Sequence, residues 1–425
     1  MAPPSEDVKL HGVRRLHAAR ILPYSCRVPQ REEAGSFLIE NGEIVLPDRV
    51  IRNGSLLAEG AKILSTGPAQ KMPFPLPAGC RRIDAKGAMV CPALWEQHIH
   101  GCGGISTERM SARSLSEMAG FLARRGIGAF LPTTVPHEES LVLLGEAIDG
   151  TTNDPGVRGR IPGISVEGPF VSLSHRGAIP EGLLRLPSLD YLQRMIDLTR
   201  GHMKMLTYAP ELPNAWALMD KLGASGVIPF LGHSGAALAD MAGYESVSPL
   251  GVTHLWNGMS GVSHKEPGLA HWALLDRHAF TEINCDGTHV DDAAVQLVLR
   301  ARPWEKLIII SDAIAPAGAS PGTTRPTLYG KPLVGRGSGL YYQDTGVLVG
   351  SQSLVPDCLA RLVHELNVPL ASAVSMATLN PARLLGCACK GALLPGYDAD
   401  IAILDRDFSH CSFLSWEGKP VFEER

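Results

Sequence analysis

The sequence predicts an α/β protein, in which a (β/α)8 barrel of the TIM type carries a small split β-sandwich domain formed by N- and C-terminal segments. Three observations predict this fold. Eight short apolar segments recur along the middle of the 425-residue chain. Segments with apolar residues near helical spacing separate them. Towards both ends, the chain instead has the pattern of short strands bounded by turn residues.

The two ends of the chain are expected to share the small domain. Residues 37–67 (FLIENGEIVLPDRVIRNGSLLAEGAKILSTG) contain Asn41-Gly42 and Asn53-Gly54, which are strong cues for hairpin turns. Residues 397–408 (YDADIAILDRDF) have a similar strand character. Two such segments can form one sheet domain, with everything between them inserted. We therefore predict a variable N-terminal extension at 1–35, the β domain at 36–87 and 388–425, and the barrel at 88–387.

The barrel strands are expected in the eight apolar segments. Each is nearly continuous in apolar character, as parallel strands buried on both faces require. Segments such as SLSEMAGFLARRG and DDAAVQLVLRARP supply helices between them. Strand and helix alternating eight times is typical of a closed barrel. The eight segments are 88–98, 128–135, 161–169, 203–211, 227–234, 251–257, 280–287 and 306–313.

Bulk properties of the chain exclude several classes of partner. The formal net charge is −4 and no basic stripe stands out, so we expect no nucleic-acid partner. No apolar run approaches the roughly 20 residues that span a bilayer, so we expect no membrane. The first 35 residues lack a secretory apolar core, which leaves a loosely docked extension or a transit peptide. The nine cysteines lack the spacing of zinc hooks, which favours reduced thiols in a cytoplasmic protein.

Ionisable residues stand where the predicted strands end, which is where such barrels carry their chemistry. In EQHIHGCGG, two histidines one residue apart place both imidazoles on the same side of a strand. Any one of these residues could be an ordinary polar side chain on a loop. Together, imidazole and carboxylate groups at one rim are typical of a catalytic metal site. The six residues are His98, His100, Glu167, His233, His254 and Asp312.

The combination of VEGPF, GHS, THLWNGMS, KEPGL, CDGTHV, SDAIAPAG and ATLNPARLLG resembles the N-acetylglucosamine-6-phosphate deacetylase family of the amidohydrolase superfamily. The resemblance runs from about residue 37 to the C-terminus. It implies a hydrolase that removes the acetyl group of N-acetylglucosamine 6-phosphate, or of a close amino-sugar phosphate, and that acts as a homodimer. It also implies one or two divalent ions per subunit, with zinc expected and iron, cobalt or manganese as alternatives.

The resemblance further implies roles for individual residues. Asp312 matches the general base and acid, and His289, in DGTHV, matches a histidine that contacts the scissile amide. A carboxylate beside the attacking water can take its proton and pass it to the departing amine. The implied metal ligands are Glu167, His233 and His254, with His98 and His100 as a pair that allows a second ion. The implied substrate-binding residues are Ala178, Ile179, Asn257, Gly258, Lys265, Asp286, His289, Leu348 and Gly350.

Several positions depart from the family pattern, and all of them concern substrate recognition. Ile179 stands where a histidine is usual, and Gly235 where an asparagine is usual. Gly258 replaces an alanine. Lys265 replaces an arginine that reaches the phosphate of a neighbouring subunit's site, and lysine lacks the bidentate fork of arginine. The chemistry is therefore better supported than the substrate.

Alternative interpretations of the sequence stay open. One is an amidohydrolase that acts on an unphosphorylated N-acetyl sugar or an N-acyl amino acid. Another is a sugar-binding homologue without turnover, which Asp312 argues against because a binding module needs no general base. His175 and His264 flank matched motifs and are further candidates for the sugar pocket. Lys204, which begins the fourth predicted strand, is interpreted as structural rather than as a carboxylated metal bridge.

Overall fold

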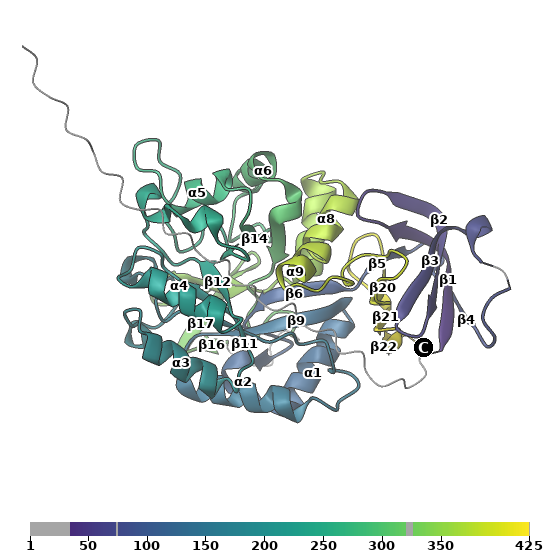
Figure 1. Ribbon diagram of the computed structural model, residues 1–425, viewed down its shortest axis with the longest axis horizontal. Helices are drawn as coiled ribbons and strands as arrows, with labels where there is room; N and C mark the ends of the chain where they lie inside the picture. Colours follow the sequence, from purple (N-terminus) through teal and green to yellow (C-terminus); the bar gives the residue numbers. More distant parts are fainter. Residues whose placement is uncertain (1–34, 74, 320–325, 425) are drawn as a thin grey trace, which may run out of the picture.

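We describe a computed structural model of the chain, in residues 35–73, 75–319 and 326–424. A barrel surrounded by helices lies beside a smaller sheet, in which purple strands from the start of the chain meet yellow strands from its end (Figure 1). The predicted α/β architecture is confirmed. The extension predicted at 1–35 lies outside the described residues, apart from residue 35.

Eight parallel strands form the barrel in the order β15-β14-β13-β12-β11-β10-β9-β6. The first and last strands approach each other through an isolated bridge between Ile99 and Ala313, and the N–H of Asp312 donates to the carbonyl of His98 at 3.0 Å. Each of the eight predicted segments overlaps one barrel strand. The strands are β6 (Leu94–Ile99), β9 (Ile127–Thr134), β10 (Ile164–Glu167), β11 (Met203–Tyr208), β12 (Ile228–Leu231), β13 (Gly251–Val252), β14 (Phe280–Asn284) and β15 (Leu307–Ile310).

The first predicted segment, 88–98, contains two strands rather than one. Its first half is β5 (Met89–Pro92), which belongs to the small sheet, and only its second half is β6. Both strands are buried throughout, so the apolar run continues across the change of sheet. Composition therefore carries no signal at Ala93, where the chain passes from one sheet to the other.

The small sheet joins the two ends of the chain in the order β22-β21-β20-β5-β1-β2-β3, with β4 paired to β1. The prediction that both chain ends build this domain is confirmed. Its strands form one continuous hydrogen-bonded sheet. The domain boundaries themselves stay a prediction. The remaining strands of this sheet are β1 (Ser36–Val45), β2 (Val50–Glu59), β3 (Lys62–Pro68), β4 (Arg81–Asp84), β20 (Ile401–Leu404), β21 (Cys411–Trp416) and β22 (Lys419–Glu423).

The turns predicted at Asn41-Gly42 and Asn53-Gly54 are wrong. Both dipeptides lie inside strands, and Gly42 pairs with Gly54 across β1 and β2 where the register shifts. The asparagines have φ of 56° and 47°, so their left-handed preference is used in facing bulges rather than in turns. A Cβ on Gly42 would lie 2.5 Å from a methyl group of Val90, so tertiary packing also requires glycine there.

Helices cover the outside of the barrel, and α8 and α9 lie where the barrel meets the small sheet (Figure 1). The two helical segments quoted from the sequence coincide with α1 and α6, which begin after the side-chain caps Ser111 and Asp291. Within the described ranges, no helix is long and apolar enough to cross a membrane. The helices are α1 (Ala112–Ala123), α2 (Glu138–Gly150), α3 (Leu189–Leu198), α4 (Ala215–Ala224), α5 (Leu269–Leu275), α6 (Asp292–Ala301), α7 (Val355–Ala360), α8 (Leu370–Met376) and α9 (Leu379–Leu384).

An antiparallel insert between β15 and α7 was not predicted from the sequence. It contains β16 (Thr327–Leu328), β17 (Lys331–Arg336), β18 (Gly339–Tyr342) and β19 (Leu348–Ser351). A bridge between Ala313 and Ser351 ties β19 to the carboxyl end of the last barrel strand. A second small ribbon, β7 (Gly101–Cys102) with β8 (Ile105–Ser106), follows the first barrel strand. Both additions extend the rim at which the strand ends meet.

Candidate active site

The carboxyl ends of the barrel strands bring the predicted metal ligands and catalytic residues together. Glu167 is the last residue of β10, and His98 is the last but one of β6. The others follow their strands within a few residues, so the closed barrel directs them to one place. A cavity of about 250 Å³ lies there, and His100, Glu167, His233, His254, His289 and Asp312 line it.

Three of these residues form a compact group. Nε2 of His233 lies 2.8 Å from Oε1 of Glu167, and Nε2 of His254 lies 2.9 Å from the same oxygen. The two Nε2 atoms are 3.1 Å apart, and all three side chains are buried. Two imidazole nitrogens and a carboxylate oxygen that converge in this way, away from water, fit a bound cation such as a divalent metal.

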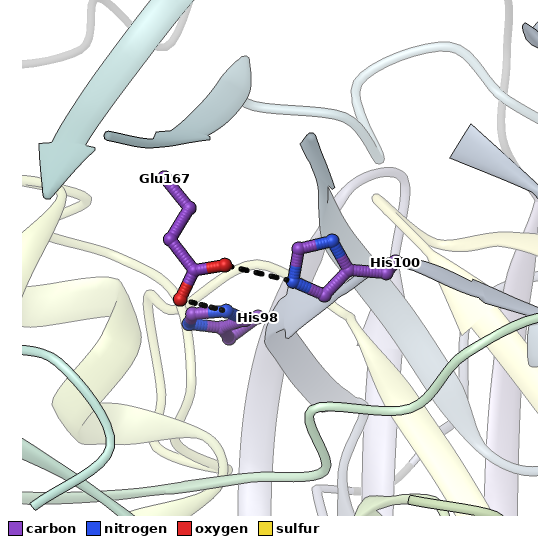
Figure 2. Close-up of side chains that lie close together, drawn as sticks. All are labelled: His98, His100 and Glu167. Carbon is purple, nitrogen blue, oxygen red and sulfur yellow. Dashed lines mark ion pairs between the residues drawn. The ribbon is translucent and has the colours of Figure 1, made fainter. Parts of the chain in front are cut away.

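A second group shares Glu167. Figure 2 shows the two oxygens of Glu167 directed at His100 and His98, at 3.4 Å and 3.7 Å from their Nε2 atoms. Nε2 of His98 is buried and has no hydrogen-bond partner. A buried polar atom without a partner is costly, and a metal ion would satisfy it. Each of the two groups would therefore suit a divalent ion, and Glu167 belongs to both.

Neighbouring acceptors orient two of the imidazoles. Nδ1 of His233 donates to the backbone carbonyl of His175 at 2.8 Å. Nδ1 of His98 donates to the carboxylate of Glu282 at 3.2 Å. Because Nδ1 carries the proton in each ring, Nε2 keeps its lone pair for a metal. His175 thus contributes its carbonyl here, and its ring does not line the cavity.

Unusual backbone conformations aim three of the side chains. His233, His254 and Asp312 have φ of 48°, 26° and 52°. Each such conformation costs a non-glycine residue on the order of 1–3 kcal/mol and persists only where its surroundings hold it. Gly258, at φ 56°, packs so closely behind His233 that a Cβ would lie 2.7 Å from Nδ1 of that ring. The site is therefore held by packing around it rather than by local preference.

Asp312 and His289 face each other across the cavity. Oδ2 of Asp312 lies 3.5 Å from Nε2 of His289, and Oδ1 lies 3.5 Å from Nε2 of His100. Burial opposes ionisation of Asp312, but the His289, His98 and His100 imidazoles outweigh it and hold the pKa of this carboxyl well below its usual range. Asp312 is therefore ionised although it is buried.

Asp286 holds His289 from behind. Its Oδ2 accepts from Nδ1 of His289 at 2.9 Å and from the hydroxyl of Ser351 at 2.7 Å. Burial would lower the pKa of His289, but the Asp286 and Asp312 carboxylates raise it to about 9. Asp286 thus lies in the wall behind the cavity rather than on its surface, unlike a direct substrate contact.

The other predicted substrate residues divide into two sets. Gly350 lies behind the surface, where a Cβ would meet Ile314 at 2.7 Å. Lys265 and His264 are exposed and do not line the cavity of their own chain. Those that line the cavity are Ala178, Ile179, Asn257, Gly258 and Leu348.

Sequence reasoning missed several residues of this site. Glu108 and Tyr329 line the cavity, and the Tyr329 hydroxyl donates to Oε1 of Glu108 at 3.2 Å. Glu108 follows the glycine-rich turn after the first strand. Its position after that turn was the one sequence feature that could have predicted it. Tyr329 belongs to the unpredicted insert. Glu282 lies in the predicted segment 280–287, but an isolated acidic residue in an apolar run carries no motif.

Comparisons with known proteins bear on this geometry. A family model described as "Amidohydrolase family" matches residues 348–422. The chain is 32% identical over 333 residues to N-acetylgalactosamine-6-phosphate deacetylase of Escherichia coli O157:H7, covering 78% of this chain and 87% of that relative. It is 31% identical over 402 residues to N-acetylglucosamine-6-phosphate deacetylase of Bos taurus, covering 88% and 94%. The chain belongs to the N-acetylglucosamine-6-phosphate deacetylase family.

Solved structures of this family share the whole architecture. The N-acetylglucosamine-6-phosphate deacetylase of Pasteurella multocida superposes with a TM-score of 0.80 at 25% identity, covering 91% of this chain and 99% of that one. A mutant of the Mycobacterium smegmatis deacetylase, in complex with N-acetyl-D-glucosamine-6-phosphate, superposes with a TM-score of 0.79 at 25% identity. The resemblance predicted from motifs is confirmed, and the chain is a hydrolase of a metal-dependent superfamily.

Proposed function

We propose that this protein hydrolyses the N-acetyl amide of N-acetylglucosamine 6-phosphate, or of a close amino-sugar phosphate, to acetate and the free amine. One observation carries the proposal. The Glu167, His233 and His254 donor set and the Asp312–His289 pair meet on a single cavity. That combination supplies a metal site and a proton-transfer group to the same bound amide, which is what amide hydrolysis requires.

The residues of the chain have separable parts in this reaction. A divalent ion bound by the ligand set supplies Lewis acidity, which activates water and polarises an amide carbonyl. Asp312 accepts the proton of the attacking water and then delivers it to the departing nitrogen. His289, held by Asp286, donates from Nε2 to the oxygen on which negative charge develops. The ligand types suit zinc best, while iron, cobalt and manganese accept the same donors.

The phosphate is proposed to bind near Asn257 and Gly258. The N–H of Asn257 donates to the carbonyl of His254 at 3.0 Å, and its side-chain NH2 donates one hydrogen to the same oxygen at 3.5 Å. The proposed donors are therefore the Gly258 N–H and the second hydrogen of the Asn257 side-chain amide. No lysine or arginine lines the cavity among residues 35–73, 75–319 and 326–424. We therefore infer a homodimer, in which Lys265 of one copy reaches the site of the other. Buried free thiols at most described cysteines favour a cytoplasmic location.

Two other substrates are supported by specific observations. The relative from Escherichia coli O157:H7 is named an N-acetylgalactosamine-6-phosphate deacetylase, so the galacto epimer is a second candidate. The absence of a described lysine or arginine from the cavity wall favours an uncharged substrate, an unphosphorylated N-acetyl sugar, as the third candidate.

Acetate release from a panel of compounds tests the proposal. The purified protein, loaded in turn with zinc, cobalt and manganese, is given both 6-phosphates, both unphosphorylated sugars and an N-acetyl amino acid. We expect the highest kcat/KM on a 6-phosphate, and release slowed by about a hundredfold or more in the Asp312→Asn variant as the matched control. Faster turnover of an unphosphorylated compound would overturn the assignment of a phosphorylated substrate. If no compound released acetate, the proposed hydrolysis of an N-acetyl amide would be wrong.

A further inference from the structure

Glu282 is a buried carboxylate directly beneath the metal ligands, and the proposed chemistry does not use it. It lies on β14, and its side chain is 1% exposed. Oε1 accepts from Nε2 of Gln97 at 2.7 Å. Oε2 accepts from Nδ1 of His98 at 3.2 Å and from the backbone N–H of His254 at 3.3 Å. One side chain therefore satisfies three donors that come from two other strand ends.

A single oxygen of Glu282 joins the two ligand groups. His98 belongs to the group with His100, and His254 belongs to the group with His233. The carbonyl of Glu282 also accepts from the N–H of Leu255 at 2.9 Å, so Glu282 holds His254 on both sides. This support matters because β13, which precedes His254, is only two residues long and His254 has φ 26°. The neighbouring backbone bonds run from the N–H of Thr253 to the carbonyl of Leu231 and from the N–H of Asn257 to the carbonyl of His254, both at 3.0 Å, so the N–H of His254 itself depends on Glu282.

We propose that Glu282 is a positioning residue that sets the affinity of the site for its ions. It fixes the Nδ1–H tautomer of His98, which leaves Nε2 as the metal-binding atom. Its negative charge makes the His98 imidazole a stronger donor to a cation. It also holds His254 in the strained conformation that points its ring at Glu167. The inference rests on the proposed metal site and does not depend on which amide is hydrolysed.

Glutamine cannot replace Glu282 without loss, although it has nearly the same shape. The carboxylate offers two acceptor oxygens, one for Gln97 and one for the His98 and His254 donors. An amide offers one acceptor oxygen and one NH2 group. With its oxygen towards His98 and His254, its NH2 faces Gln97, whose own side-chain amide can turn so that Oε1 accepts. The substitution can therefore keep the hydrogen bonds, and what it removes is the charge beside His98.

Glu96 provides a matched control. It is equally buried, at 0% exposed, and precedes His98 on the same strand. Its Oε1 accepts from the backbone N–H groups of Ser311 at 3.2 Å and His98 at 3.5 Å, and burial raises the pKa of this carboxyl to about 8. The Glu96→Gln side chain keeps one acceptor oxygen for those donors. It therefore changes a buried carboxyl group to an amide without contacting a ligand ring.

The test measures metal binding directly, without substrate. Purified wild type, Glu282→Gln and Glu96→Gln are stripped with a chelator and titrated with zinc and with cobalt against a competing chelator. For Glu282→Gln we expect affinity weakened by about 10- to 100-fold, the usual effect of replacing a hydrogen-bond partner of a ligand histidine. We also expect an altered visible spectrum of the cobalt form, and a thermal midpoint of the metal-free protein close to that of wild type. Glu96→Gln should keep wild-type affinity.

A double variant keeps the test decisive if Glu282→Gln alone does not fold. Gln97→Glu with Glu282→Gln exchanges the donor and the acceptor, so every side-chain hydrogen bond is kept while the charge leaves the residue that touches His98. We expect it to fold and to bind zinc more weakly than wild type. Wild-type affinity in both variants, or equal weakening in Glu96→Gln, would overturn the inference. Failure of the wild type to bind any ion would instead overturn the proposed function.

Discussion

The proposed catalytic residues lie at the strand ends, and their surroundings shift the pKa values of two of them. Asp312 stays ionised although it is buried, because the imidazoles around it outweigh the burial. His289 has a raised pKa because two carboxylates flank it. An adjacent acid and base with pKa values pushed apart are typical of a group that shuttles protons.

Asp312→Asn should retain metal and lose turnover. The amide keeps the size of the side chain but cannot accept a proton, so we expect kcat to fall by about a hundredfold or more, the scale of a lost general acid–base. Acetate release and metal content measured on the same sample check this. Near-normal kcat would show that another group moves the proton.

Replacing Glu167 should remove any ion that either histidine group binds, because both groups contain Glu167. Its two oxygens are shared between the histidine pairs, so Glu167→Ala should leave little bound metal and no activity. His98→Ala with His100→Ala should cost less, because the Glu167, His233 and His254 group stays intact. Elemental analysis of the two variants compares them. Unchanged metal content in Glu167→Ala would mean that the ligand set is wrong.

At the scale of elements, the insert β16–β19 forms part of the wall of the site. Tyr329 reaches from its first turn to Glu108, which follows the first barrel strand. Leu328, Leu333, Val347 and Leu348 add an apolar surface to the same cavity. The barrel therefore supplies the chemistry, and the insert supplies part of the surface that contacts the substrate.

Tyr329→Phe should weaken substrate binding more than catalysis. The substitution removes the hydrogen bond that holds Glu108 at the cavity wall, so we expect KM to rise by roughly a few-fold while kcat changes little. Tyr341→Phe, in β18 of the same insert and not on the cavity wall, is the control. Steady-state measurement of KM and kcat for both variants tests this prediction. A fall in kcat with unchanged KM would contradict this role.

At the scale of the whole molecule, a buried ion cluster lies near the junction of the small sheet and the barrel. Nζ of Lys390 lies 3.0 Å from Asp398, 2.9 Å from Asp400 and 3.3 Å from Glu417, and is 3% exposed. It also lies 4.3 Å from the ring of Trp416, which packs against Trp95 of the barrel strand β6. The cluster thus links the chain end to the barrel wall.

Lys390→Met should destabilise the fold by about 3–5 kcal/mol, because it leaves buried carboxylates without their cation. Burial opposes the charge of Lys390, but its carboxylate neighbours outweigh it and raise its pKa above the usual value. The stability that Lys390 provides is therefore complete below its unfolded pKa of about 10.4 and is lost as pH rises beyond it.

Thermal unfolding between neutral and strongly alkaline pH measures both effects. The midpoint of the wild type should fall more steeply above that pKa than the midpoint of Lys390→Met. Lys331→Met is the control, because Lys331 pairs with Asp344 at 3.2 Å on the surface and such pairs contribute about 1 kcal/mol or less. Equal destabilisation by the two substitutions would show that the buried cluster contributes no more to stability than a surface ion pair.

Lys265 tests the proposed dimer. Lys265→Ala should raise KM for the phosphorylated sugar about tenfold, as expected for losing one charge-assisted hydrogen bond, and leave the unphosphorylated sugar almost unaffected. Mixing Lys265→Ala with Asp312→Asn subunits should restore one complete site per mixed dimer if Lys265 acts in a second copy. A monomer in solution, or no effect on KM, would remove Lys265 from the site.

The sequence by itself determined the barrel and which ionisable residues meet at its rim. Eight apolar segments of strand length are needed to fill a barrel core, and their burial on both faces makes them visible in the sequence. His98, Glu167, His233, His254 and Asp312 follow those segments directly, so their convergence could be predicted from the closure of the barrel alone. Motifs then identified the family, because several short patterns occur together over most of the chain.

Only the tertiary structure decided what depends on contacts between distant segments. Asn41-Gly42 and Asn53-Gly54 are turn signals by local preference, but opposing strands use them as bulges. Gly42 and Gly258 are required by what packs against them, which no local pattern records. Glu282 accepts hydrogen bonds from donors at the ends of two other strands. Lys265 does not line the cavity of its own chain. Local propensity predicts elements, whereas the partners of a buried polar group are chosen only when the chain closes on itself.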